Sequence, residues 1–386
     1  MHQLTLKHIV GFATILSAMF QISNTGIAAT NEWSVPISDD GAMIRVPVTA
    51  FGRSLYFLID TGLSISTIDK KYENQLGDVI TENRAESPLS ASNNISIYHC
   101  PEILLGGHPL KLQTIACMDM TMARLVSGEP CDGMLGMDFF GNKVVSFNFD
   151  ERLLSLYERT PEIAKSASTI VPIKTFYAHY MVDVLLNGKV PVSLMLDTGD
   201  SGSLSFNDSD WEKVFSANSN DVYSATVGAI GSHSAKTQLG RIEKLQLGPL
   251  TYTHLHALYI HNRSDVSHLG LNFFRRHVVT FDFPNQKLYL QPGKRFAMPD
   301  KNDMSGLHLL RIDGLTVVHS VDENSPAFNA GIRAEDTIQS INGEGSLTMN
   351  SIREMLQSEA GKRIKLQMQR GDHSWQTEFT LIEPMP

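Results

Sequence analysis

The chain is poor in cysteine, with three among 386 residues, and short of positive charge, with 32 lysines and arginines against 41 acidic residues. A formal net charge of −9 argues against a nucleic-acid-binding protein, which needs a basic face. An odd number of cysteines leaves at least one thiol free, and none stands in a recognisable nucleophile motif. A thiol enzyme is therefore not indicated.

A long apolar run is also missing, because the stretch from Ile9 to Phe20 is too short to span a membrane comfortably. Lys7 precedes this stretch, and the small residues of Gly26-Ile27-Ala28-Ala29 follow it, which is typical of a secretory signal. We expect residues 1–29 to be a signal peptide and the mature chain to be periplasmic or secreted, with no stable membrane span after cleavage. An uncleaved membrane anchor is the alternative.

What the chain does contain is one short stretch twice, Leu58-Ile59-Asp60-Thr61-Gly62 and Met195-Leu196-Asp197-Thr198-Gly199. A second shared segment follows each copy, at Gly136 (76 residues after Asp60) and at Gly270 (73 residues after Asp197). Two similar strands then end each half, at 144–149 and 153–157 in the first and at 278–283 and 287–290 in the second. A repeat at a fixed spacing predicts two related lobes, at residues 33–157 and 168–291.

Two Asp-Thr-Gly triplets, each followed by an apolar-apolar-Gly segment, resemble the pepsin and retropepsin aspartic peptidases over roughly residues 33–291. The resemblance implies a mainly β fold of two barrel-like lobes around a cleft. It also implies catalysis by Asp60 and Asp197, with the loops shaped by Thr61, Gly62, Thr198 and Gly199. Because both aspartates lie in one chain, a monomer is sufficient for the active site. No metal or organic cofactor is implied, and the substrate would be a peptide or an unfolded protein.

Two like charges this close cannot both ionise, so the dyad shares one proton. Pepsins usually have Ser or Thr after the triplet, whereas this chain has Leu63 and Asp200. Leu63 removes a hydrogen bond and Asp200 adds negative charge, and both changes disfavour a fully charged dyad. We therefore expect a milder working pH than that of pepsin. His268 takes the place of an apolar residue in the segment expected to pack beneath the second loop.

Several local signals place the site. The polar stretch 87–94 lies where a substrate-covering hairpin would fall, and Gly228 to Ser234 is the corresponding candidate in the second lobe. Asn187-Gly188 indicates a hairpin, residues 208–217 a short helix, and residues 158–167 a polar hinge.

Two further groups of residues were candidates for crosslinks or metal sites. Exported proteins can form disulfides, and Cys100 with Cys117 is the favoured pair, although the sequence does not fix the pairing among these and Cys131. His254, His256 and His261 invite a metal check, with the first two expected on one strand face. They lack an accompanying cluster of cysteines or carboxylates, so surface histidines are the favoured interpretation.

The region after a linker at 292–304 resembles a bacterial PDZ domain, at residues 304–383. The resemblance is carried by Ser325-Pro326-Ala327, Ala330-Gly331-Ile332 and Ile341-Asn342-Gly343. It implies a groove that adds a peptide as a strand and binds its C-terminal carboxylate at Gly306, Leu307, His308 and Leu309. The domain would recruit substrate or regulate access to the protease. The alternative for the whole chain is a catalytically silent peptide-binding or scaffold protein that uses this groove.

Overall fold

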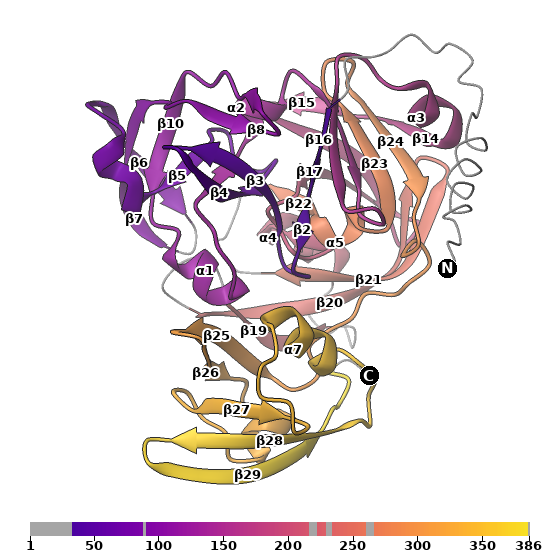
Figure 1. The fold of residues 1–386 in the computed structure, drawn as a ribbon. Helices are drawn as coiled ribbons and strands as arrows, with labels where there is room; N and C mark the ends of the chain where they lie inside the picture. The colour runs from indigo at the N-terminus through magenta and orange to yellow at the C-terminus, as the bar shows by residue number, and fades with distance from the viewer. Residues whose placement is uncertain (1–32, 88–89, 216–221, 229–233, 260–265, 385–386) are drawn as a thin grey trace, which may run out of the picture.

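The computed structural model describes residues 33–87, 90–215, 222–228, 234–259 and 266–384. The chain is mainly β, with one sheet for each lobe, one between the lobes and one in the C-terminal domain (Figure 1). The expected signal at residues 1–29 lies outside the described residues. Within the described ranges, no helix has the length and apolar character needed to cross a membrane.

Among the residues that the structure describes, the first lobe contains thirteen strands and three short helices, and a connecting helix follows it. They are β1 (Trp33–Pro36), β2 (Ser38–Asp39), β3 (Ile44–Ala50), β4 (Arg53–Ile59), β5 (Thr67–Asp69), the 3₁₀ helix η1 (Lys70–Gln75), β6 (Val79–Ser87), β7 (Ser90–His99), β8 (Ile103–Leu105), β9 (His108–Pro109), β10 (Thr114–Met118), α1 (Thr121–Ser127), β11 (Gly133–Leu135), α2 (Met137–Phe140), β12 (Val144–Asn148) and β13 (Leu153–Tyr157), with the connecting helix α3 at Glu162–Ala167.

The second lobe and the C-terminal domain follow in the same order along the chain. The second lobe comprises β14 (Thr169–Pro172), β15 (Lys174–Phe176), β16 (His179–Leu186), β17 (Val190–Asp197), β18 (Leu204–Phe206), α4 (Asp208–Val214), β19 (Val222–Gly228), β20 (Ser234–Leu247), β21 (Leu250–Tyr259), β22 (Ser267–Gly270), α5 (Leu271–Phe274), β23 (His277–Asp282) and β24 (Lys287–Pro292). The C-terminal domain comprises β25 (Leu307–Ile312), β26 (Leu315–Val321), α6 (Pro326–Asn329), β27 (Thr337–Ile341), α7 (Met349–Leu356), β28 (Arg363–Arg370) and β29 (His373–Thr380).

The strands repeated in the sequence meet in the sheet between the lobes, whose order is β1-β13-β12-β23-β24-β14. The central pair, β12 and β23, runs antiparallel with Ser146 opposite Thr280, and the Thr280 hydroxyl donates a hydrogen bond of 3.0 Å to the Ser146 hydroxyl. Each half of this sheet therefore comes from one copy of the duplication. Its large side chains, such as Phe147 and Phe281, join the core that runs through both lobes.

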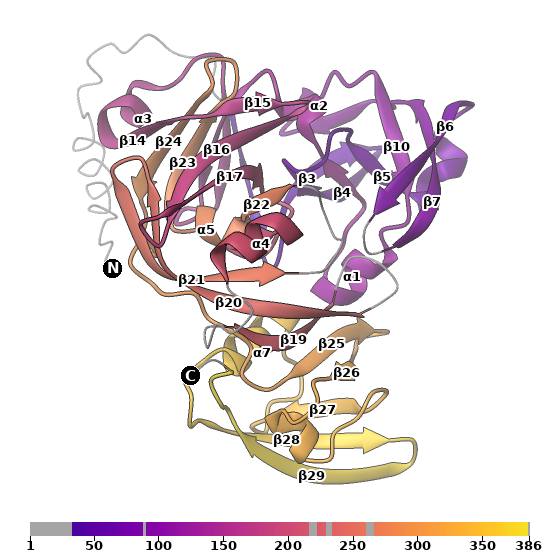
Figure 2. The ribbon, with the colours of Figure 1, turned by 180° about the vertical axis from the view of Figure 1, so that it is seen from behind.

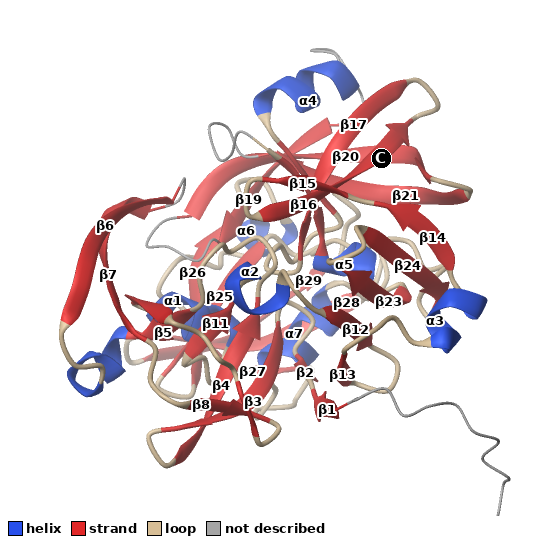
Figure 3. Ribbon diagram, turned by 90° about the horizontal axis from the view of Figure 1, so that it is seen from above, coloured by secondary structure: helices blue, strands red, loops and turns tan. Residues whose placement is uncertain are grey.

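The strands that end in the two triplets have the same neighbours in both lobes. In the first lobe β4 pairs in parallel with β11, and β11 pairs antiparallel with β5. In the second lobe β17 pairs in parallel with β22, and β22 pairs antiparallel with β18. Each triplet therefore emerges at the same point of an equivalent sheet, and the two sheets lie side by side when viewed from above (Figure 3).

Several local predictions are confirmed. Asn187 and Gly188 adopt left-handed φ values of 50° and 72° between β16 and β17, and the Lys189 N–H closes this tight turn by donating a hydrogen bond of 3.0 Å to the Leu186 carbonyl. Helix α4 begins at Asp208, and the Asn207 side chain accepts a hydrogen bond of 2.8 Å from the Asp210 N–H, a typical N-cap. The expected polar hinge needs a correction, because residues 162–167 of it form α3.

Both stretches proposed as flaps belong to hairpins. Strands β6 and β7 form one antiparallel pair, and β19 and β20 form the other. The tips, at residues 88–89 and 229–233, lie outside the described residues.

The favoured Cys100–Cys117 disulfide is wrong, because all three cysteines are free. The reason is the register of the sheet. The Cys100 N–H bonds to the Gln113 carbonyl, whereas Cys117 lies opposite Ser96. About four strand positions therefore separate the two thiols along the ladder, roughly 13 Å at 3.4 Å per residue, well beyond disulfide reach.

The C-terminal domain lies beside the two lobes, next to α1 and β19 (Figures 1 and 2). Its five strands run in the order β25-β26-β27-β28-β29. The Thr348 hydroxyl caps α7 by accepting a hydrogen bond of 3.1 Å from the Ser351 N–H, so the helix begins at Met349. Apolar residues of α7, including Ile352 and Leu356, are buried in a core that is separate from that of the lobes.

Candidate active site

The two triplets face each other, with each glycine packed against the carboxylate of the opposite lobe. A Cβ on Gly62 would lie 2.5 Å from Asp197 Cγ, and a Cβ on Gly199 would lie 2.5 Å from Asp60 Oδ1. No side chain fits at either position, so glycine is required by close approach. The Gly62 and Gly199 N–H groups each donate a hydrogen bond of 2.9 Å to the aspartate of their own triplet. The structure therefore brings both predicted aspartates together.

The two threonines join the loops through four buried hydrogen bonds. The Thr61 hydroxyl donates to the Leu196 carbonyl (2.8 Å) and accepts from the Thr198 N–H (3.0 Å). The Thr198 hydroxyl donates to the Ile59 carbonyl (3.1 Å) and accepts from the Thr61 N–H (3.1 Å). Each hydroxyl is thus used as both donor and acceptor across the lobe boundary, which fixes the aspartates relative to each other.

The second lobe adds two ionisable groups to this centre. His268 lies on β22, opposite Met195 of β17, and is 8% exposed. Its Nδ1 lies 3.0 Å from Asp197 Oδ2 and 3.6 Å from Asp200 Oδ2, within ion-pair distance of both carboxylates. His268 was expected only to pack beneath the loop, so the sequence analysis missed its role. The signal was its replacement of an apolar residue.

Burial and neighbouring charge shift the protonation of this centre. Burial, reinforced by the negative charge of Asp197, raises the pKa of Asp60 to about 8, and the Gly62 N–H and His268 oppose this rise only in part. Burial alone would lower the pKa of His268, but the attraction of Asp197 and Asp200 outweighs it and raises the pKa to about 9. Near neutral pH, Asp60 therefore holds a proton and His268 is an imidazolium.

The position of His268 corrects one part of the pH argument. We expected the charge of Asp200 to act on the dyad as an unopposed negative group. Asp200 is instead buried at 5% exposure within 3.6 Å of the imidazole, so the positive charge of His268 offsets it. The rise in the pKa of Asp60 comes from burial and Asp197.

Asp197, Asp200 and His268 also form the one trio of possible metal ligands among the residues that the structure describes, with ligand atoms within 4.8 Å of one another. The 3.0 Å contact between His268 and Asp197 already brings opposite charges together. The arrangement is therefore complete as an ion pair, and we assign no metal to it.

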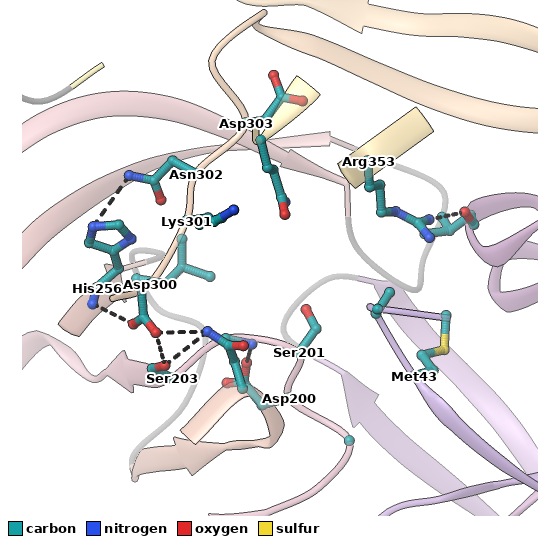
Figure 4. Close-up of a pocket in the computed structure, with 18 of the residues that line it drawn as sticks. Met43, Asp200, Ser201, Ser203, His256, Asp300, Lys301, Asn302, Asp303 and Arg353 are labelled. Carbon is teal, nitrogen blue, oxygen red and sulfur yellow. Dashed lines mark hydrogen bonds between the residues drawn. The ribbon is translucent and has the colours of Figure 1, made fainter. Parts of the chain in front are cut away.

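Residues 292–304, expected to be a linker, are fastened to the second lobe beside the cleft (Figure 4). The buried Asp300 carboxylate accepts hydrogen bonds from the Ser203 hydroxyl (2.8 Å) and the His256 N–H (2.8 Å). It also pairs with the Arg276 guanidinium at 2.6 Å. Because Ser203 follows the second triplet closely, this segment supports the loop that carries the triplet as well as connecting two domains.

The histidines considered for a metal site are not a cluster. His254 is exposed, has a φ of 54° and pairs with Glu243 at 3.7 Å. His256 is half-buried beside Asn302, and burial lowers its pKa. His254 and His256 therefore differ in burial, and their placement on one strand face stays a prediction. His261 lies outside the described residues.

The PDZ loop expected to bind a carboxylate already uses part of its hydrogen-bonding capacity. The Gly306 N–H donates to the Asp303 carboxylate at 2.9 Å, and the Leu307 N–H donates to the Ser305 hydroxyl at 3.1 Å. His308 instead pairs through its side chain with Asp322, at 3.1 Å. Of the four predicted residues, the first two thus have their N–H groups engaged inside the domain.

One cavity of about 1850 Å³ extends from the dyad to the PDZ domain. It is lined by Asp60 and Asp197 at one end and by Leu307, His308 and Leu356 at the other. The groove between β25 and α7 therefore opens toward the cleft that contains Asp60 and Asp197.

Lobe 1 holds the other end of α7. The Arg353 guanidinium donates hydrogen bonds to the Val126 carbonyl and, at 3.5 Å, to the Asp40 carbonyl (Figure 4). A Cβ on Gly128 would lie 2.7 Å from Met349 Cγ, which shows how closely the two surfaces pack.

Comparison with protein families matches residues 182–273 to an aspartyl protease domain and residues 317–370 to a PDZ domain. The chain combines an aspartyl protease domain with a C-terminal PDZ domain. The aspartyl protease match includes Asp197, Thr198, Gly199 and His268, and it ends at Phe273 within α5. No curated protein matches the chain.

Proposed function

We propose that the protein is an aspartic endopeptidase in which Asp60 and Asp197 hydrolyse peptide bonds with an activated water. The observation that supports this most strongly is the reciprocal packing of each glycine against the carboxylate of the other triplet. This packing brings the two aspartates side by side in a cleft. Because the pKa of Asp60 is raised, its carboxyl group keeps the single proton that the dyad shares.

The reaction needs one ionised and one protonated carboxylate. The ionised carboxylate takes a proton from water while the hydroxide adds to the peptide carbonyl carbon, and the protonated carboxylate gives its proton to the carbonyl oxygen. Proton transfer to the amide nitrogen then allows the C–N bond to break. The products are a carboxylic acid and an amine, and no covalent enzyme intermediate is formed.

A peptide or an unfolded protein is the substrate that suits the cleft, because a folded chain cannot enter a cavity that ends at another domain. The apolar character of residues 9–20 and the small residues after it support export, so we place the mature protein in the periplasm or outside the cell.

We propose that the PDZ domain regulates access to the cleft. It lies at the far end of the cavity and is held there by Arg353, while two N–H groups of its carboxylate loop are engaged internally. Arg353→Ala removes the hydrogen bonds to lobe 1, so we expect cleavage of an unfolded protein to rise several-fold, with a smaller change for a short peptide. A loss of protein cleavage would instead support substrate recruitment by the domain.

The test of the proposed activity is cleavage of an unfolded protein from pH 3 to pH 8 by the purified mature enzyme and by Asp60→Asn. We expect the substitution to lower the rate by about 10³-fold or more, because it removes the acid–base partner. Pepstatin serves as a second probe, and the melting temperature shows whether the variant is folded. Equal cleavage by both proteins, or none by the wild type, would contradict the proposal.

The alternative is a catalytically silent protein that binds peptides through the PDZ groove. The specific observation in its favour is that the groove is continuous with a large cavity. Such a protein would bind peptide equally well with Asp60 or Asn at position 60.

A further inference from the structure

The duplication allows each residue near the dyad to be compared with its counterpart in the other lobe. Aligning the triplets places Leu63 opposite Asp200, and aligning the apolar-apolar-Gly segments places Met134 opposite His268. Leu63 and Met134 belong to one apolar cluster of lobe 1. Asp200 and His268 lie within 3.6 Å of each other in lobe 2. Two positions that are apolar in lobe 1 therefore hold an ion pair in lobe 2.

We infer that His268 is a positioning residue of this centre, which together with Asp200 holds Asp197 as the ionised member of the dyad and leaves the proton on Asp60. This inference rests on the proposed peptidase activity and deepens it. The geometry is asymmetric: His268 Nδ1 is 3.0 Å from Asp197 Oδ2, and Asp60 makes no ion pair with it in the described structure. A buried imidazolium favours ionisation of the carboxylate that it contacts.

The charges of the centre balance in this arrangement. With Asp60 protonated, Asp197 and Asp200 ionised and His268 protonated, the net charge is −1, the same as that of a simple dyad sharing one proton. Asp200 and His268 thus enter as a neutral pair. Removing either one alone leaves an uncompensated charge in a buried site, which is costly.

The ionisable groups around His268 come from the elements that flank β22. Strand β17 contributes Asp197, the loop after it contributes Asp200, and β18 contributes no ionisable residue. Asp60 lies across the dyad, and His268 opposes a small part of the rise in its pKa that burial and Asp197 cause. Beside β22, Asp210 accepts a hydrogen bond of 2.6 Å from the Ser267 hydroxyl and is paired with Lys213 at 2.9 Å.

The test is a double-mutant cycle that converts the lobe 2 pair into the lobe 1 pair. His268→Met leaves Asp200 beside the dyad without its cation, so the acidic limb of the kcat/KM profile should move to higher pH by about one unit or more. This corresponds to about a tenfold loss at a pH on that limb. Asp200→Leu leaves His268 paired with Asp197 alone and should move the same limb to lower pH.

The double variant Asp200→Leu/His268→Met should return the limb to within about half a unit of the wild type, because the two changes cancel. The loss in His268→Met should appear in kcat more than in KM. His254→Met, at an exposed histidine of the same lobe, is the matched control and should leave the profile unmoved. The inference would be overturned if both single variants moved the acidic limb in the same direction. It would also be overturned if the limb of the double variant stayed where His268→Met places it.

A measurement without turnover separates this inference from the proposed activity. In protein labelled with ¹³C-histidine, the His268 signal is identified by its absence in His268→Met. We expect it to titrate near pH 9 in the wild type and about one unit or more lower in Asp200→Leu. Titration of His268 below pH 6.5 would overturn the inference even if the enzyme is active. Normal titration without cleavage would overturn the proposed activity alone.

Discussion

The two lobes share their topology and differ in the charge that they bring to the dyad. Strands β4 and β17 end in equivalent triplets, and the threonine hydrogen bonds are the same in both directions. Beside the first triplet lies the apolar Leu63, whereas Asp200 beside the second is paired with His268. A duplicated scaffold can therefore position two identical carboxylates and still surround them with different neighbouring charges.

The lobes also differ in how they hold the PDZ domain. Lobe 1 contacts the PDZ domain non-covalently, through two backbone carbonyls that accept hydrogen bonds from Arg353. Lobe 2 is joined to it covalently through residues 292–304, which Asp300 ties to Ser203 near the second triplet. Movement of the PDZ domain would therefore pull on lobe 2 through the covalent segment 292–304. The same movement would break the hydrogen bonds between Arg353 and lobe 1.

The largest effect on the free energy of unfolding is expected for the threonine hydrogen bonds, which are the same in both lobes. Thr61→Val and Thr198→Val each remove a buried hydroxyl that donates one hydrogen bond and accepts another. Because each leaves a buried N–H and carbonyl without a partner, we expect a loss of about 2–4 kcal/mol in the free energy of unfolding. Chemical denaturation measures both variants.

Equal losses of unfolding free energy in the two threonine variants would show that the two lobes contribute equally to the hydrogen bonds that join them. A difference above about 1 kcal/mol would show that one lobe contributes more than the other. Conversion to serine is the matched control, because serine keeps the hydroxyl and should retain most of the stability.

A smaller effect, on the pH dependence of stability, is expected for the Asp200–His268 pair, which only lobe 2 has. The folded pKa of His268 is raised to about 9, so the folded state binds more protons than the unfolded state between about pH 6.5 and 9. The stability from this pair is present below pH 6.5 and is lost as the pH rises through 9, with a slope of at most about 1.4 kcal/mol per pH unit. The double variant Asp200→Leu/His268→Met should flatten that slope, as measured by denaturation at pH 6.5, 7.5 and 8.5.

An unchanged slope in the double variant would show that His268 does not hold the extra proton. Asp60 also binds a proton up to about pH 8 and contributes to the same slope. Asp60→Asn in both backgrounds removes that contribution and leaves the part that belongs to His268.

The sequence predicted what depends on local or repeated patterns. The two triplets, the turn at Asn187-Gly188 and the PDZ segments are short strings whose residue types are required by a tight backbone path or a close contact. The duplication placed the two aspartates together because equivalent strands end at equivalent points.

What depends on contacts between distant residues could not be read in the same way. The register of β7 against β10 separates Cys100 from Cys117, and no local signal fixes such a register. The approach of His268 to Asp197 depends on the pairing of β22 with β17. A comparison of the two copies could have found it, because His268 and Asp200 both depart from apolar counterparts.

The most direct test of this account is the pH dependence of kcat/KM for a short peptide from pH 2 to pH 10. The account predicts a maximum at mildly acidic to neutral pH and an alkaline limb near pH 8, where Asp60 loses the proton that it gives to the substrate carbonyl. Activity at pH 6 should exceed that at pH 2 by about tenfold or more. A maximum near pH 2, with activity lost before pH 6, would contradict it, because Asp60 would then lose its proton far below pH 8.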